Sequence, residues 1–223
     1  MPCPHLTKER DQMNLRYGIF LRPDPATCWA VTQITTALRQ QFGLVSAGAY
    51  PPHMTLIGNL ATHASSDQLV ARLDPVFSSV APITVFNSGV QRQGDGYEYN
   101  VDLDRDATRP NGDLGVIAAD TMAAVLPLSI AVDDLLTTPV EEYVFAGHLG
   151  LASHDLKVNH HLTDEVGEFI DGLPVITPPS FVARWYSLFE FCADDWQGQW
   201  WQSLTWRNVR SWEATTLAGR VTP

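Results

Sequence analysis

The stretch Tyr50–Gly58, with the sequence YPPHMTLIG, decides how the rest of the chain is interpreted. Its two prolines indicate a loop, and the apolar residues after them indicate a short β-strand. Alternate residues of a strand face the same side, so His53 and Thr55 point together while Met54 and Leu56 point the other way. The stretch therefore predicts a pair of polar side chains on one face of a strand whose other face is apolar.

A second stretch repeats this pattern 95 residues further along the chain, from Phe145 to Ala152, with the sequence FAGHLGLA. It carries His148 on an apolar strand, but Gly150 stands where the first stretch has its threonine. We interpret the two stretches as the two halves of one site.

The composition of the 223-residue chain limits the classes of function. The chain is long enough for a sizeable core, as one large domain or as two small lobes. No apolar run approaches the roughly 18 residues that a membrane-spanning helix needs, so we expect no membrane partner. The formal net charge of −11 repels a long polyanion on average, whereas it is compatible with a small anionic ligand in a local pocket.

Residues 1–14 are polar with mixed charges, so we expect a flexible N-terminal arm that is neither a signal peptide nor a transit peptide. Cys3 and His5 lie in this arm, and two such residues alone do not make a metal site. The three cysteines, Cys3, Cys28 and Cys192, are far apart and form no C-x-x-C pair. This spacing indicates a reducing compartment, and we expect the protein to be cytoplasmic.

Hydrophobic periodicity and capping residues predict the order of the elements. Strands are expected at about 17–22, 53–58, 83–90, 96–103, 142–152 and 181–191, with a hairpin turn at 93–96. Helices are expected from Pro25 to the loop near Gly43, from Ser66 to Phe77, from Asp113 to Val125 and from Thr163 onward. Asp24, Ser66, Asp113 and Thr163 are the expected N-cap residues. A tryptophan-rich segment from Trp196 to Trp212 ends the series.

The order of helix, histidine strand, helix and strand occurs twice, which indicates a duplication of elements without a close sequence repeat. Neither half has the Gly-rich phosphate turn of a dinucleotide fold. We therefore expect an α+β fold with two pseudo-symmetric lobes, each a mostly antiparallel sheet backed by helices, which face each other across a central cleft. The lobes are expected at about residues 15–110 and 111–223 of a single bilobal domain.

Two other motifs have simpler structural interpretations. The D-x-D-x-D spacing of Asp102–Asp106 can hold Mg²⁺, but the loop sequence after it favours a solvated strand end. The segment His161–Thr163 contains a complete H-x-T, but the acidic residues and the helical stripe after it favour Thr163 as a helix N-cap.

With these residues in place, the sequence resembles the 2H phosphoesterase superfamily, which includes RNA 2′,3′-cyclic phosphodiesterases and proteins named for 2′-5′ RNA ligation. The signature of this superfamily is two H-x-(T/S) motifs on strands. Pro52–Leu56 matches the first motif, and Phe145–Ala152 matches the second except at Gly150. The opening strand, the helix after it, the motif spacing and the closing strand Leu188–Phe191 also resemble the family, over roughly residues 15–215.

The resemblance implies a two-histidine mechanism that needs neither a metal nor another cofactor. Opening a cyclic phosphodiester needs a base for water and an acid for the leaving ribose oxygen, and His53 and His148 can serve as this pair near neutral pH. The sequence does not say which histidine takes which role. Thr55 would donate a hydrogen bond to a phosphate oxygen. Gly150 offers no hydroxyl at the matching position, where a water molecule or Ser153 could substitute.

A cyclic nucleotide also needs groups that hold its base. Members of the family place an aromatic residue of the first strand in the cleft, which by position is Phe20 here. Tyr97, on the strand after the hairpin, is the second candidate for stacking on a base. Core packing is the competing interpretation for both rings. Tyr50 comes just before His53 and is expected to line the entrance.

These residues predict a metal-independent phosphodiesterase that opens 2′,3′-cyclic phosphates of nucleotides or short RNA ends, acting as a monomer. The acidic balance favours small nucleotides over long RNA. One alternative is a nucleotide-binding module that kept the cleft but has weak or no turnover because of Gly150. Another is a phosphodiesterase for a different cyclic or 2′-5′-linked nucleotide. RNA ligation is disfavoured, because the sequence shows no nucleotidyl-transfer lysine motif.

Overall fold

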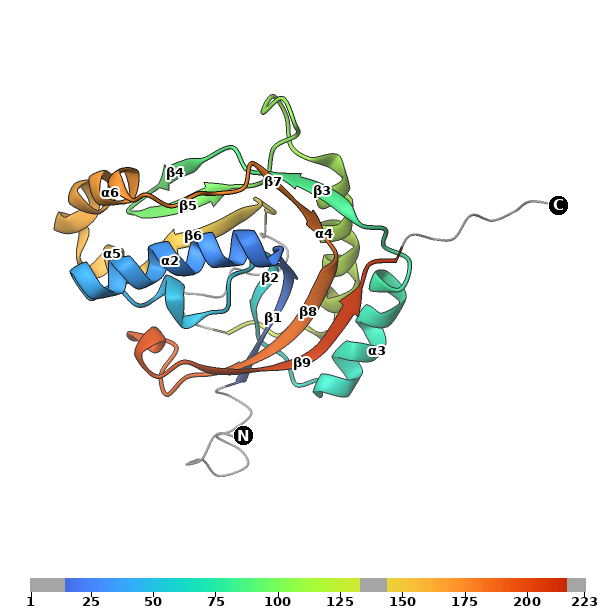
Figure 1. Cartoon of the computed structure of the whole chain (residues 1–223). Coiled ribbons are helices and arrows are strands. Elements are labelled where there is room, and N and C mark those ends of the chain that lie inside the picture. Colours follow the sequence, from blue (N-terminus) through green and yellow to red (C-terminus); the bar gives the residue numbers. More distant parts are fainter. Residues whose placement is uncertain (1–14, 133–143, 216–223) are drawn as a thin grey trace.

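A computed structural model describes residues 15–132 and 144–215 (Figure 1). Its main element is a seven-stranded antiparallel sheet with the strand order β4-β5-β6-β2-β1-β8-β9. The strands are β1 (Leu15–Arg22), β2 (Met54–Leu60), β4 (Val90–Gln93), β5 (Gly96–Asn100), β6 (His148–Ala152), β8 (Trp185–Cys192) and β9 (Thr205–Glu213). Strands β3 (Ile83–Phe86) and β7 (Ser180–Ala183) pair with each other in a two-stranded antiparallel sheet. Residues 1–14, the expected N-terminal arm with Cys3 and His5, lie outside the described residues.

The helices are α2 (Pro25–Phe42), α3 (Ser66–Phe77), α4 (Gly112–Val125), α5 (His154–Val158) and α6 (Thr163–Gly172), with 3₁₀ turns η1 (Ala47–Ala49), η2 (Leu126–Leu128), η4 (His160–Leu162) and η5 (Trp200–Gln202). Helix α2 packs over β6, while α3 and α4 pack against each other beside β2, β8 and β9 (Figure 1). The expected α+β class, with a large antiparallel sheet and several helices, is confirmed. None of the helices within the described ranges is long and apolar enough to cross a membrane.

Local capping explains where the helices begin. The Asp24 carboxylate accepts a hydrogen bond from the backbone N–H of Thr27 at 2.8 Å, so α2 starts where the sequence predicted. Gly43 ends the same helix with a φ of 73°, a left-handed conformation that glycine adopts without strain.

Three of the expected caps differ in the structure. Ser65 caps α3 in place of Ser66 because its side chain completes a capping box with the backbone and side chain three residues later. The Asn111 side chain caps α4 in place of Asp113. Thr163 is the first residue of α6, but its hydroxyl does not cap the helix.

The strands do not form the two separate facing sheets that the sequence analysis predicted. Met54 of β2 pairs with Leu149 of β6, and this pair joins the strands into one sheet. The pairing also crosses residue 110, because β5 pairs with β6 while β8 pairs with β1. The β4-β5-β6 side and the β1-β8-β9 side of the sheet therefore each contain strands from both halves of the chain.

Two expected strands are each divided into two. The strand expected at 83–90 is interrupted by Gly89, which has a φ of 98° and donates its N–H to the Asn87 side chain at 2.9 Å. Its first part, β3, pairs with β7 rather than with β5. The strand expected at 181–191 is divided at Arg184 into β7 and β8, which belong to different sheets.

Two apolar clusters lie on opposite faces of β1 and β8. The main core contains the buried residues of α2 and most of the buried apolar side chains of the sheet. Phe20, Phe189 and Phe191 alternate along their strands with residues of this core, so their rings point to the other face. Trp200 and Trp201 pack with them. This second, mainly aromatic cluster lies on the face of the sheet to which Thr55 also points, because Phe20 and Thr55 are paired.

The two cysteines in the described part of the chain differ in state. Cys192, at the end of β8, is disulfide-bonded, while Cys28 is a free thiol.

Candidate active site

His53 lies at the end of the loop that leads into β2. Met54 and Leu56 are fully buried on the opposite side of the strand, which fixes the side to which His53 and Thr55 point. The Nδ1–H of His53 donates a hydrogen bond to the carbonyl oxygen of Pro51 at 2.7 Å. A carbonyl oxygen can only accept, so the neutral ring carries its proton on Nδ1 and leaves Nε2 as a proton acceptor.

His148 repeats this arrangement at the first residue of β6. Its Nδ1–H donates to the carbonyl oxygen of Ala146 at 2.9 Å, again two residues earlier in the chain. The Asp102 carboxylate accepts a hydrogen bond from the Gly147 N–H at 3.1 Å and so holds the backbone before the histidine. A Cβ at Gly147 would lie 3.1 Å from the Asp102 Cα, which explains the glycine at this close approach. The neutral His148 ring therefore also offers Nε2 as its acceptor.

The register between β2 and β6 brings the two motifs together. Met54 of β2 is paired with Leu149 of β6. In this antiparallel register, His53 lies opposite Gly150 and Thr55 lies opposite His148. Directly opposite residues have Cβ atoms about 5 Å apart, and diagonal neighbours are about 7 Å apart. The two histidines and Thr55 therefore share one face of the sheet, with the histidines placed diagonally across two strands.

His53 is enclosed by aromatic rings. The Phe20 ring stacks on it, with centroids 3.9 Å apart and planes inclined by 26°, and the Tyr50 ring lies 5.5 Å away. Burial lowers the pKa of His53 to about 4; the hydrogen bond to Pro51 opposes this shift, and the positive charge of His148 adds to it. His53 is therefore neutral near pH 7 and able to accept a proton.

Glu98 is a site residue that the sequence analysis did not identify. It lies on β5 opposite Gly150, and its Oε2 is 3.9 Å from Nδ1 of His148. Burial raises the pKa of Glu98, while the positive charge of His148 acts against this rise. The sequence signal that could have identified Glu98 is the alternation along β5. Glu98 and Asn100 share one face of this strand, whereas Tyr97 points to the other face.

A cavity of about 710 Å³ lies beside His53, and this volume is within the range of small-ligand sites. Tyr50 and Gly150 also line it. A Cβ added at Gly150 would meet nothing within 4 Å. The position at which the superfamily motif carries a hydroxyl is therefore an open part of the cavity wall.

The structure places three of the expected substrate-binding residues elsewhere. Phe20 is only 2% exposed under the His53 ring, so it has no free face for a base. The Tyr97 hydroxyl donates to a backbone carbonyl at the start of α6 at 3.0 Å, which ties β5 to that helix. The Ser153 hydroxyl lies 2.9 Å from that of Ser46. Phe20 supports the histidine ring, and the other two side chains have structural partners.

A buried carboxylate anchors the loop that carries Tyr50 and His53. Asp155 of α5 accepts hydrogen bonds from the backbone N–H and the hydroxyl of Ser46, at 2.7 and 2.6 Å, and another from the Val45 N–H. Both Asp155 and Ser46 are buried. Hydrogen bonds to a charged acceptor are stronger than neutral ones, so this contact fixes the loop that leads to the first histidine.

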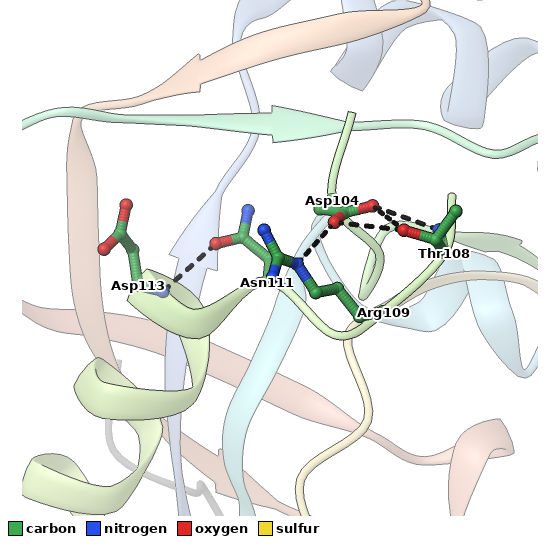
Figure 2. A network of polar contacts seen from close by, with 5 residues as sticks. All are labelled: Asp104, Thr108, Arg109, Asn111 and Asp113. Carbon is green, nitrogen blue, oxygen red and sulfur yellow. Dashed lines mark hydrogen bonds and ion pairs between the residues drawn. The ribbon is translucent and has the colours of Figure 1, made fainter. Parts of the chain in front are cut away.

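Asp104, in the middle of the segment Asp102–Asp106, stabilises its own loop. Figure 2 shows the Asp104 carboxylate accepting hydrogen bonds from the Thr108 backbone at 3.1 Å and from Arg109 Nε at 2.9 Å. These bonds lower the pKa of Asp104, and the bond from the Thr108 backbone has the largest effect. Within the described parts of the chain, no group of three or more His, Cys, Asp or Glu side chains is arranged to hold a metal ion.

No protein-family model and no curated protein matches the sequence. Solved structures define the class: the chain has the fold of the 2H phosphoesterase superfamily. It is similar to LigT of E. coli complexed with 3′-AMP, with 13% identity, a TM-score of 0.51, and coverage of 91% of this chain and 99% of that chain. It is also similar to TT0787 of Thermus thermophilus, with 12% identity, a TM-score of 0.55, and coverage of 89% and 97%. A phosphoesterase structure matches with 12% identity, a TM-score of 0.50, and coverage of 90% and 99%. At these identities the similarity establishes the fold and leaves the reaction to the site.

Proposed function

We propose that the protein is a phosphodiesterase that opens 2′,3′-cyclic phosphates of nucleotides or short RNA ends without a metal ion. The observation that carries this proposal is the matched pair of His53 and His148, each held at Nδ1 by the carbonyl oxygen two residues before it. Both rings then offer Nε2 on the same face of a phosphoesterase fold. The proposed partner is short because the net charge of −11 disfavours long RNA, and the proposed enzyme is a monomer.

The surroundings of the two rings divide the acid and base roles. With its pKa lowered to about 4, His53 is the base: its Nε2 takes a proton from water as the water oxygen bonds to phosphorus. His148 is then the acid, with the Glu98 side chain 3.9 Å from its Nδ1. Its Nε2 proton passes to the ribose oxygen as the bond between that oxygen and phosphorus breaks.

Hydroxyl donors stabilise the charge that develops on the non-bridging phosphate oxygens. Thr55 lies across from His148 and supplies one such donor in this proposal. Gly150 supplies none at the matching place across from His53. Loss of one donor of this kind costs about 100-fold in rate, so we expect slower turnover than an enzyme with both hydroxyls would have.

The test is hydrolysis of the 2′,3′-cyclic mononucleotides in the presence of EDTA by the wild type, His53→Ala and His148→Ala. We expect turnover to survive EDTA and to fall by about 100-fold or more in each variant. Thermal melting of the three proteins controls for unfolding. Turnover that persists in both histidine variants would refute the assignment of the site.

A nucleotide-binding protein with weak or no turnover is the second candidate, and the absent hydroxyl at Gly150 favours it. Calorimetric binding of a mononucleotide without product formation would support this candidate over the first. A panel that includes other cyclic and 2′-5′-linked nucleotides would reveal a different substrate for the same two histidines.

A further inference from the structure

The cavity beside His53 has a charge distribution that contrasts with that of the whole chain. The sequence has 25 acidic residues and 14 lysines and arginines. Among the described residues that line the cavity, none is Asp or Glu, and Arg39 of α2 is the only charged side chain besides the titratable His53. An arginine without a carboxylate beside it in the lining favours an anionic ligand.

The cavity extends along α2 between Arg39 and His53. Gly43 ends α2 with its N–H bonded to the Arg39 carbonyl oxygen at 3.0 Å. The chain then turns back along the helix, and a Cβ at Gly48 would lie 3.4 Å from the Cβ of Thr35, one turn nearer the helix start. Figure 1 shows this segment passing alongside α2 on its way to β2. Arg39 therefore lines the same cavity as His53.

Arg39 is the charged hydrogen-bond donor that an anion in this part of the cavity would meet. Its side chain is exposed, and it forms no ion pair with a carboxylate within residues 15–132 and 144–215. The hydroxyls of Thr32 and Thr35, which also line the cavity, already donate to carbonyl oxygens of α2 at 2.8 and 3.2 Å. They are left as acceptors, which do not suit a phosphate, whereas a guanidinium binds phosphate oxygens with two parallel hydrogen bonds.

We propose that Arg39 binds a second phosphate of the substrate, so that the substrate is an oligonucleotide end with at least one phosphate besides the one that reacts at His53. This inference rests on the proposed function and narrows its substrate class. A free mononucleoside cyclic phosphate would leave Arg39 without a phosphate. The competing role for Arg39 is to complement the dipole of α2 from its last turn, and this role does not depend on the substrate.

The test compares a nucleoside 2′,3′-cyclic phosphate with a dinucleotide that ends in the same cyclic phosphate. We expect Arg39→Ala to lower kcat/KM about tenfold for the dinucleotide and less than about twofold for the mononucleotide. Arg39→Lys keeps the positive charge and should retain most of the activity on the dinucleotide. Arg72→Ala, which removes an exposed arginine of α3 away from the cavity, should leave both values unchanged.

Binding of the ring-opened mononucleotide and dinucleotide products, measured by calorimetry, separates this inference from the hydrolytic function. If the wild type turns over neither substrate, the proposed hydrolysis fails. Dinucleotide binding that is about tenfold weaker in Arg39→Ala than in the wild type would still support the second phosphate site. An equal loss for both ligands, or no loss for the dinucleotide, would overturn it. A lower melting temperature of Arg39→Ala with unchanged binding would assign Arg39 to helix stability and also overturn it.

Discussion

The two histidine motifs share one backbone arrangement but lie in different surroundings. His53 is covered by the Phe20 and Tyr50 rings, and Thr55 follows it on the same face. The His148 side chain is 42% exposed and lies near Glu98. In the second motif, open space at Gly150 replaces the hydroxyl.

This difference is the basis for the opposite roles that we propose for two identical side chains. The carbonyl oxygen two residues earlier selects the same tautomer in both motifs, because that contact is local to each strand entrance. The surroundings of the two rings come from residues of other strands, an aromatic ring at His53 and a carboxylate near His148. Environments that separate the charge states of two titratable groups are how enzymes assign an acid and a base.

Exchanging the hydroxyl between the motifs tests the comparison most strongly. We expect Thr55→Val to lower kcat for cyclic phosphate hydrolysis about 100-fold, because it removes a phosphate donor without changing the shape of the side chain. Gly150→Thr should raise kcat by up to about 100-fold, since the added side chain enters open space. The double variant should recover most of the loss if the two positions act on the same phosphate.

Gly150→Ala and Thr55→Ser are the matched controls. The first adds a Cβ without a hydroxyl and should leave kcat unchanged, and the second keeps the hydroxyl and should retain activity. A rate increase in Gly150→Ala equal to that in Gly150→Thr would show that strand rigidity, rather than the hydroxyl, limits the reaction.

The lowered pKa of His53 also makes stability depend on pH. The pKa of His53 is about 4 in the folded protein and has an ordinary value of 6.5. The unfolded chain therefore binds more protons between these values, so the free energy of unfolding falls as the pH drops through this window. The full shift corresponds to about 3 kcal/mol at its acid end. His154, whose pKa burial beside Trp200 also lowers to about 4, contributes in the same direction.

Urea denaturation of the wild type and His53→Gln at about pH 7 and about pH 4.5 measures this contribution. We expect the variant to lose about half of the pH dependence, because His154 still provides its part. A variant with the same pH dependence as the wild type would show that His53 is solvated enough to protonate in the folded state.

The sequence predicted elements better than it predicted their partners. The start of α2 follows from Asp24 and Pro25, and its buried stripe follows from a period of 3.6 residues, so both are local signals. The pairing of β3 with β7 joins residues almost a hundred positions apart, and no local pattern specifies it. Gly89, whose positive φ separates β3 from β4, could have been interpreted as the end of the first strand.

The same distinction applies to the candidate site. Alternation within one strand predicted that His53 and Thr55 share a face, and the structure places His148 beside them; their catalytic roles stay predictions. Glu98 acts through a contact between strands that are about fifty residues apart in sequence, so it became visible only with the register of β5 and β6. Phe20 was chosen for its aromatic ring, but a ring on the site face can serve the histidine instead of the substrate.

The smallest expected effect, and the one specific to the second motif, is that of Glu98→Gln. This variant keeps the side-chain shape but removes the negative charge 3.9 Å from His148 Nδ1. Proton donation by His148 then loses a nearby negative charge, so kcat/KM should fall by about tenfold near neutral pH.

Glu190→Gln provides the control, because it removes another strand carboxylate of similar exposure, which pairs with Arg207 on β9 at 2.7 Å. Its kcat/KM should equal that of the wild type. A kcat/KM that stays at the wild-type value in Glu98→Gln, or that falls equally in Glu190→Gln, would show that Glu98 does not assist His148. The environments of the two motifs would then differ only on the side of His53.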